Sequence, residues 1–362
     1  MFQPRCLPIL IGSLPLQDHT EAAEMILKYT PEIPLWPQLP KRNKEGMVRQ
    51  FLTGFPGLID EGKRFWIDTD SEDFADEMTS FYEEYLLAES DAGLLKTSRF
   101  ALGADSAAGF AAFLDILISR NQSTVTLKGQ ITGPVTTGIG TKDRHGNSIF
   151  YNDNLRDMLI KLLSLKASWQ VMELRNHTGT AAPIIFIDEP GMVSFGSSSF
   201  AGVSREMVTS AVGEVIEAIQ KTGGLAGVHI CANGDWGPAL DSGADILSFD
   251  AYSYFNNIAL YTAELTTFLK RGGILAWGII PTGDPLIVSE ENSDSLFAKW
   301  LDQLETLTTL GFTKQRIMEQ TLIAPACGTG SLTLELAGKV LQMNRDVAAK
   351  CQDHLRQYSR GS

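Results

Sequence analysis

The sequence predicts an α/β protein, a (β/α)8 TIM barrel that occupies residues 1–362 as a single domain with an N-terminal helical excursion. Short apolar runs with strand character alternate with amphipathic runs of helical period along most of the chain. Eight of the apolar runs qualify as barrel strands. Chemically reactive residues follow them, and the active sites of such barrels lie at the carboxyl ends of the strands. An open doubly wound sheet is the weaker alternative, because no glycine-rich dinucleotide or phosphate loop is present.

The predicted elements are bounded by apolar periodicity and by glycine or proline. Apolar residues from Met207 to Ile219 recur at helical spacing and are followed by Gly223-Gly224, a typical helix stop. Pro37 ends the second strand, because proline lacks the N–H group that a sheet requires. In chain order, the predicted strands are residues 7–11, 33–36, 124–130, 183–187, 227–232, 245–249, 274–280 and 322–326. The predicted helices are residues 21–29, 44–51, 71–88, 154–175, 207–219, 258–271, 293–310 and a C-terminal helix, with the excursion at residues 65–88.

The composition is that of an ordinary protein with a buried core, with 44% hydrophobic and 20% charged residues. The net charge of -13 argues against nucleic acid and anionic membrane surfaces as partners, since both are bound by clustered Lys and Arg. The apolar runs are shorter than the roughly 18 residues that span a bilayer. Residues 8–16 lack the basic leader and cleavage site of a signal peptide, and four cysteines do not form a disulfide framework. We therefore expect a cytoplasmic protein.

Two soft-metal ligands stand out in residues 227–232, where one residue separates His229 from Cys231. On a β-strand every second side chain points to the same face, so this pair forms half of a metal site. Cys327 also follows an apolar strand, whereas the remaining two cysteines lie near the termini. Two cysteines and a histidine are a ligand set of catalytic zinc, which keeps a fourth position for water or substrate. The alternative is that each of the three is a buried packing residue.

Three carboxylates follow other predicted strands. Asp250 is expected to complete the metal site or to act as a base, with a helix cap as the alternative. Asp188 and Glu189 are adjacent, so their side chains diverge on a strand and at most one faces the barrel mouth directly. A carboxylate there is expected to hold a substrate ammonium group or a hard metal, with a capped turn as the alternative. We take Asp188 and Asp250 as the candidate catalytic carboxylates, and we predict an exposed loop at residues 142–147.

Together these motifs resemble the catalytic C-terminal barrel of the cobalamin-independent methionine synthases. That family belongs to a superfamily with the uroporphyrinogen decarboxylases and the coenzyme M methyltransferases. The resemblance covers most of the chain and is strongest over residues 124–332; each motif is short, and their shared order makes the resemblance specific. The matching motifs are Ile11-Gly12-Ser13, residues 128–136 (Lys-Gly-Gln-Ile-Thr-Gly-Pro-Val-Thr), Ile187-Asp188-Glu189-Pro190, His229-x-Cys231 and Cys327-Gly328.

The resemblance implies a zinc-dependent methyltransferase of methionine biosynthesis that alkylates a small thiol such as homocysteine or coenzyme M. The family's glutamate ligand to the metal corresponds to Asp250 in this chain. The implied zinc ligands are therefore His229, Cys231, Asp250 and Cys327. The residues implied to bind the amino-acid part of the substrate are Ile11, Ser13, Asp188 and Glu189.

The chain departs from the family pattern in three respects. Full-length members have an additional N-terminal barrel that this chain lacks. Residues 36–43 offer no carboxylate where the family has a glutamate for the substrate amine, and Thr137-Gly138-Ile139-Gly140 replaces an expected folate-stacking tryptophan. A methylcorrinoid protein is therefore a candidate methyl donor in place of folate.

Two other hypotheses for the function stay open. One is a metal-free enzyme similar to uroporphyrinogen decarboxylase, although residues 40–43 match the arginine-rich motif of that group poorly. The other is a non-catalytic barrel that binds a corrinoid or another methyl carrier.

Overall fold

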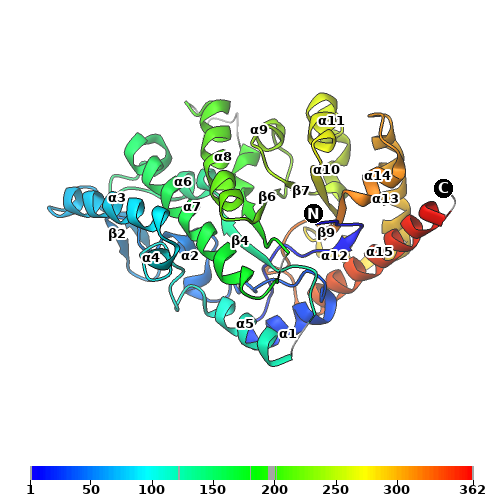
Figure 1. The fold of residues 1–362 in the computed structure, drawn as a ribbon, viewed down its shortest axis with the longest axis horizontal. Helices are drawn as coiled ribbons and strands as arrows, with labels where there is room; N and C mark the ends of the chain where they lie inside the picture. The colour runs from blue at the N-terminus through cyan, green and yellow to red at the C-terminus, as the bar shows by residue number, and fades with distance from the viewer. Residues whose placement is uncertain (1, 121–122, 180, 195–199, 201, 361–362) are drawn as a thin grey trace.

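A computed structural model describes residues 2–120, 123–179, 181–194, 200 and 202–360. Its centre is a curled sheet of seven parallel strands in the order β1-β9-β8-β7-β6-β5-β4, surrounded by helices (Figure 1). The strands of this sheet are β1 Leu7–Pro8, β4 Lys128–Thr132, β5 Ile184–Asp188, β6 Leu225–Ile230, β7 Ile246–Phe249, β8 Ile274–Ile280 and β9 Thr321–Pro325. The α/β barrel class predicted from the sequence is confirmed.

Residues 33–36, predicted to form the second strand, lie beside β4 but do not form a regular strand. Leu35 forms an isolated parallel bridge with Lys128 on β4, and Gln38 forms another with Ser13. Prolines recur at every third position from 31 to 40. Proline has no N–H to donate, so a continuous ladder cannot form here. The prediction of eight strands was therefore wrong by one among the described residues, although this segment joins the β1 and β4 ends of the sheet.

Helices follow most strands and pack on the outside of the sheet. The α-helices are α1 His19–Tyr29, α2 Arg49–Leu52, α3 Phe74–Ser90, α4 Ala92–Leu95, α5 Ala108–Arg120, α6 Pro134–Gly140, α7 Asp153–Arg175, α8 Arg205–Lys221, α9 Gly237–Asp241, α10 Ala251–Ile258, α11 Thr262–Lys270, α12 Pro285–Glu290, α13 Ser293–Thr308, α14 Lys314–Glu319 and α15 Leu334–Arg360. The short 3-10 helices are η1 Asn43–Glu45, η2 Ile149–Tyr151 and η3 Pro190–Ser194.

Two predicted helices are divided in the structure. Residues 258–271, expected to form one helix, contain the end of α10 and all of α11, because Asp250 caps a helix that begins directly after β7. Residues 44–51 contain parts of η1 and α2, separated by Gly46, which has extended backbone angles. Periodicity alone does not locate such breaks, since apolar residues on both sides face the same core.

The interior of the barrel changes from apolar to polar along its axis. A cluster of buried apolar side chains fills the interior, including Ile184 and Phe186 of β5 and Ile246 of β7. Side chains two residues apart share one face of a strand. Asp188 therefore follows Phe186 on the inner face, and Ser248 follows Ile246, toward the carboxyl ends. The carboxyl end is thus the polar end of the barrel.

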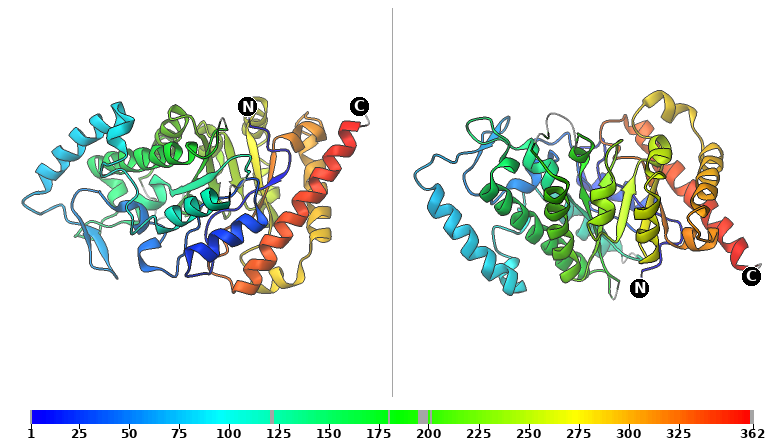
Figure 2. Two further views of the ribbon diagram at one scale, coloured as in Figure 1. Left: turned by 60° about the horizontal axis from the view of Figure 1, so that its bottom comes forward. Right: turned by 90° about the horizontal axis from the view of Figure 1, so that it is seen from above.

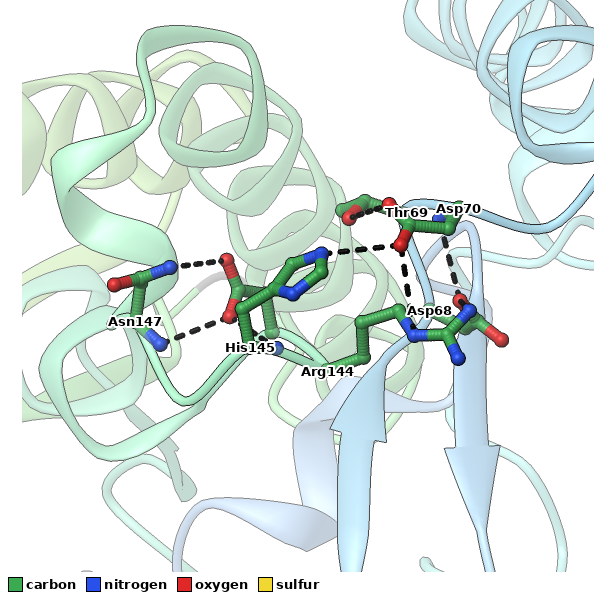
Figure 3. A network of polar contacts seen from close by, with 7 residues as sticks. Asp68, Thr69, Asp70, Arg144, His145 and Asn147 are labelled. Carbon is green, nitrogen blue, oxygen red and sulfur yellow. Dashed lines mark hydrogen bonds and ion pairs between the residues drawn. The ribbon is translucent and has the colours of Figure 1, made fainter.

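The excursion comprises a hairpin, β2 Leu58–Asp60 and β3 Phe65–Ile67, and the long helix α3 (Figure 2). The hairpin is joined to the loop predicted to be exposed at residues 142–147 (Figure 3). Arg144 contacts Asp68 at 3.1 Å, and Nε2 of His145 lies 3.0 Å from Asp70. These exposed pairs attach the hairpin to the barrel, and His145 is not part of the group of candidate metal ligands described below.

One buried lysine on α7 provides a test of the packing that is independent of the site. Lys166 is fully buried, and its Nζ donates to the carbonyl oxygens of Arg99 and Ala101 at 3.3 and 3.2 Å. Burial lowers the pKa of Lys166 from 10.5 to about 7. The folded state therefore releases a proton that the unfolded state retains between these pH values.

Stability is accordingly expected to rise with pH from about 7 to about 10.5, because the unfolded state binds more protons in this window. In Lys166→Met this contribution is absent. Between pH 6.5 and 9.5, the unfolding free energy of wild type should rise by about 3 kcal/mol more than that of the variant. Urea unfolding of both proteins at the two pH values measures this shift, and parallel pH profiles would contradict the assignment.

Candidate metal centre

His229 lies near the end of β6 and points into the barrel. Its side chain is 2% exposed, and its Nδ1 lies 2.9 Å from the Oγ of Ser248 on β7. Its Nε2 is buried and has no hydrogen-bond partner among the described residues. A buried polar nitrogen without a partner is costly, so this nitrogen is available to a ligand.

Cys231 and Cys327 meet His229 at the carboxyl end of the barrel. Cys231 follows β6, and Cys327 follows β9. One ligand atom of each of the three residues lies within 4.8 Å of the other two. In the sheet, β7 and β8 separate β6 from β9, so curling of the sheet brings the two cysteines together. The grouping of the three residues predicted from their spacing is thus present.

A glycine on β8 permits this close approach. A Cβ at Gly278 would lie 2.3 Å from the carbonyl oxygen of Phe249 and 2.9 Å from the Cα of Ala326. Both contacts are with backbone atoms, which cannot move aside as a flexible side chain can. Gly278 therefore lets β8 pack closely between β7 and the residue that precedes Cys327.

The two thiols influence each other's protonation. The hydrogen bond from Cys327, followed by the interactions with His229, lowers the pKa of Cys231 below its usual range. The same hydrogen bond, with burial, raises the pKa of Cys327. Of the two sulfurs, Cys231 is therefore the one whose thiolate form the surroundings favour. Thiolates are the form of cysteine that binds metal ions.

Asp188 ends β5 and pairs in register with His229 on β6. It is 3% exposed, and its Oδ1 has no hydrogen-bond partner among the described residues. Burial raises the pKa of Asp188, while the neighbouring His229 and Lys128 act in the opposite direction. A buried carboxylate with an unused oxygen can accept a hydrogen bond from an ammonium or hydroxyl group of a ligand.

Lys128 is a member of the site that sequence analysis noted only as part of a motif. It is fully buried at the start of β4, and its Nζ donates to the carbonyl oxygen of Ile11 at 2.6 Å and lies 4.4 Å from the ring centre of Phe186. Burial lowers the pKa of Lys128, and the charge of Asp188 opposes this effect. The position of Lys128 in a predicted buried strand could have identified it from the sequence, because a buried charged residue needs a partner.

Glu189 diverges from Asp188 and binds protein groups. Its carboxylate accepts hydrogen bonds from the N–H groups of Val135 and Thr136, both at 2.8 Å, and from the Thr136 hydroxyl at 2.6 Å. Gly133 leaves the space for this, since a Cβ there would lie 2.1 Å from the Glu189 Oε1. Glu189 thus fixes the first turn of α6 against β5, and its predicted substrate-binding role gains no support from this arrangement.

The predicted substrate-binding turn lies against the loop that follows Cys327. The carbonyl oxygen of Ser13 accepts from the N–H and the hydroxyl of Thr329 at 3.0 and 3.1 Å, and the Ser13 hydroxyl accepts from the N–H of Gly330 at 3.3 Å. Ile11 contributes its side chain to the barrel interior and its carbonyl oxygen to Lys128. The fold therefore brings Ile11 and Ser13 next to the carboxyl end of β9, which Cys327 follows.

Asp250 caps α10 and is separate from the group of three. One of its carboxylate oxygens accepts from the N–H of Ser253 at 2.8 Å. Burial raises its pKa, and the negative charge of Cys231 contributes in the same direction. The atoms that lie within ligand distance of one another belong to His229, Cys231 and Cys327 alone among the described residues. A metal role for Asp250 remains a prediction, and the alternative role as a helix cap is the one the geometry displays.

Comparison with protein-family models finds no match, and comparison with curated proteins finds none either. Among solved structures, the chain is similar to a B12-independent methionine synthase from Shewanella sp. W3-18-1 in complex with selenomethionine. The TM-score is 0.58 at 15% sequence identity, and the match covers 97% of this chain and 99% of that chain. At this identity the likeness shows the fold alone. The chain shares the α/β barrel fold of that structure.

The match therefore extends over nearly the full length of both chains. A further finding concerns membranes: among the described residues, no helix is long and apolar enough to cross a bilayer.

Proposed function

We propose that this protein is a zinc-dependent methyltransferase that transfers a methyl group to a small thiol. The observation that carries the proposal is the meeting of a histidine nitrogen and two cysteine sulfurs at the polar end of the barrel, where the Nε2 of that histidine lacks a hydrogen-bond partner among the described residues. The likeness to a methionine synthase supports it, since that enzyme shares the fold and was solved with selenomethionine, an amino acid that carries a methylated selenium.

The donor set fits Zn2+. Two sulfurs and one nitrogen suit a borderline-soft cation, and three protein ligands leave a fourth position for a substrate. His229, Cys231 and Cys327 would hold the ion, and the buried Nε2 of His229 would thereby gain the partner that it lacks. When bound, Zn2+ supplies a positive charge that stabilises a substrate thiolate near neutral pH.

The surrounding residues have separate tasks in this proposal. Asp188 accepts the ammonium group of an amino-acid thiol on its unused oxygen, and Lys128 supplies the compensating charge behind it. Ser13 and Ile11 line the site beside Cys327, and Glu189 anchors the first turn of α6. Asp250 lies close enough to Cys231 for the charge of Cys231 to raise the pKa of Asp250, and it serves as the reserve base or ligand.

The transfer is a displacement at the methyl carbon. The substrate thiol gives up its proton to solvent, and its sulfur forms a bond to the methyl carbon. The bond between the methyl group and the donor breaks, and its electron pair stays on the donor. No oxidant or reductant is required. A folate or a methylcorrinoid protein can act as donor, and homocysteine or a coenzyme M-like thiol can act as acceptor. The two cysteine ligands and the substrate thiol must stay reduced, so we place the reaction in the cytoplasm, which is a reducing compartment.

Metal analysis of the purified protein tests the proposal. About one zinc per chain is expected, and the zinc X-ray absorption spectrum should gain a sulfur ligand when the accepted thiol, homocysteine or coenzyme M, is added. Zinc that gains no sulfur from either thiol would favour a non-catalytic barrel that binds a methyl carrier. A protein that takes up no zinc after replenishment would refute the proposal and favour a metal-free decarboxylase-like enzyme.

A further inference from the structure

The centre of the barrel mouth is occupied by three side chains in one row across three neighbouring strands. Asp188 on β5 pairs in register with His229 on β6, and His229 pairs in register with Ser248 on β7. The imidazole therefore has a carboxylate on one side and a hydroxyl on the other. All three side chains are buried, with exposures of 3%, 2% and 0% in the same order.

The hydrogen bonds in this row are distributed unevenly. Nδ1 of His229 lies 2.9 Å from the Ser248 hydroxyl. His229 Nε2 and Asp188 Oδ1 both lack partners among the described residues. A carboxylate is the stronger acceptor for an imidazole N–H, because charge-assisted hydrogen bonds exceed neutral ones in strength. The imidazole nevertheless contacts the hydroxyl, so the two groups that the proposed reaction needs are both kept free.

We propose that Ser248 is a positioning residue that assigns the roles of its two neighbours. Its hydroxyl accepts a hydrogen bond from Nδ1–H of His229, which makes Nε2 the unprotonated nitrogen and directs it toward Cys231 and Cys327. The same contact keeps the imidazole from turning toward Asp188, whose Oδ1 stays available to a substrate. This inference rests on the proposed metal function of His229, since a ligand nitrogen is fixed by the hydrogen bond that the other ring nitrogen makes.

The choice of a serine at this place has a physical basis. A hydroxyl can accept from Nδ1–H without adding a further negative charge near the Asp188 carboxylate. An alanine would leave Nδ1 buried without a partner, at the full desolvation cost of that group. The ring would then gain by rotating to give an N–H to Asp188, and both the metal ligand and the free carboxylate would be lost together.

The test compares Ser248→Ala with Ser248→Thr, which retains the hydroxyl, and with Ser164→Ala, which removes a buried serine of α7 outside the site. Zinc affinity is measured by competition with a chelator, and the ligand environment by the spectrum of the cobalt-substituted protein. We expect Ser248→Ala to lose about 10- to 100-fold in affinity with an altered spectrum. Ser248→Thr should recover most of the affinity, and Ser164→Ala should match wild type.

Unchanged zinc affinity and cobalt spectrum in Ser248→Ala would overturn the inference while wild-type zinc binding still supported the proposed function. Failure of wild type to bind zinc would refute the function itself, so the two outcomes are distinguishable. If Ser248→Ala does not fold, nitrogen NMR of labelled histidine in the zinc-loaded wild type decides the question. A proton on Nδ1 of His229 is expected, and a proton on Nε2 would contradict the assignment.

Discussion

Cys231→Ser and Cys327→Ser are each expected to lose bound zinc and, with it, methyl transfer, while the barrel stays folded. Each change replaces a thiolate, a strong ligand for zinc, by a hydroxyl that stays protonated at neutral pH. Because three protein ligands carry the site, the loss of one should weaken zinc binding by roughly a thousandfold or more. Zinc content after dialysis against a weak chelator and circular dichroism of the same samples measure both parts of the expectation.

Cys351→Ser is the matched control for these variants. Cys351 is fully buried on α15, and its pKa is raised by burial and by a hydrogen bond with Cys6. Its partner Cys6 bonds to Met318 and Thr321 at the start of β9, whereas Cys327 follows the end of that strand, so removal of Cys351 should leave zinc content unchanged. Full zinc occupancy in Cys231→Ser or Cys327→Ser would show that the assigned ligand set is wrong. Zinc loss in the control as well would point to a general defect in folding.

Asp188→Asn is expected to separate the recognition of the substrate amine from the binding of zinc. The change keeps the shape of the side chain and removes its negative charge, so a charge-assisted hydrogen bond becomes a neutral one. For an amino-acid thiol such as homocysteine, the KM should rise by roughly 30- to 100-fold, which corresponds to about 2 to 3 kcal/mol. For coenzyme M, which has no ammonium group, the KM should change little. Zinc content should match wild type.

Steady-state kinetics with both thiols measure this contrast, and Glu189→Gln provides the comparison. Glu189 bonds to Val135 and Thr136, so its replacement should lower the thermal stability and affect the two thiols alike. Equal effects of Asp188→Asn on both thiols would remove Asp188 from substrate recognition. A larger effect of Glu189→Gln on homocysteine would restore Glu189 as the amine ligand.

Much of the architecture was predictable because local patterns carry it. Buried parallel strands are continuous apolar runs, and seven of the eight predicted strands correspond to β1 and β4 to β9 of the central sheet, with shifts at their ends. The segment at residues 33–36 was the exception, because its prolines prevent a regular ladder although its apolar residues occupy a strand position. The helix at residues 258–271 was misjudged because a cap at Asp250 begins α10 earlier than the periodicity indicates.

The sequence by itself determined the barrel class, the order of its strands and the His-x-Cys pair, since these depend on residues close together in the chain. Only the tertiary structure decided which distant groups meet. Curling of the sheet brings Cys327 to His229 and Cys231, a relation between β9 and β6 that no local period encodes. The strand register places His229 between Asp188 and Ser248. Glu189 hydrogen-bonds the first turn of α6, whereas one oxygen of Asp188 has no partner among the described residues. The direction of a side chain at a strand end depends on the strands beside it, and those neighbours are set when the sheet closes.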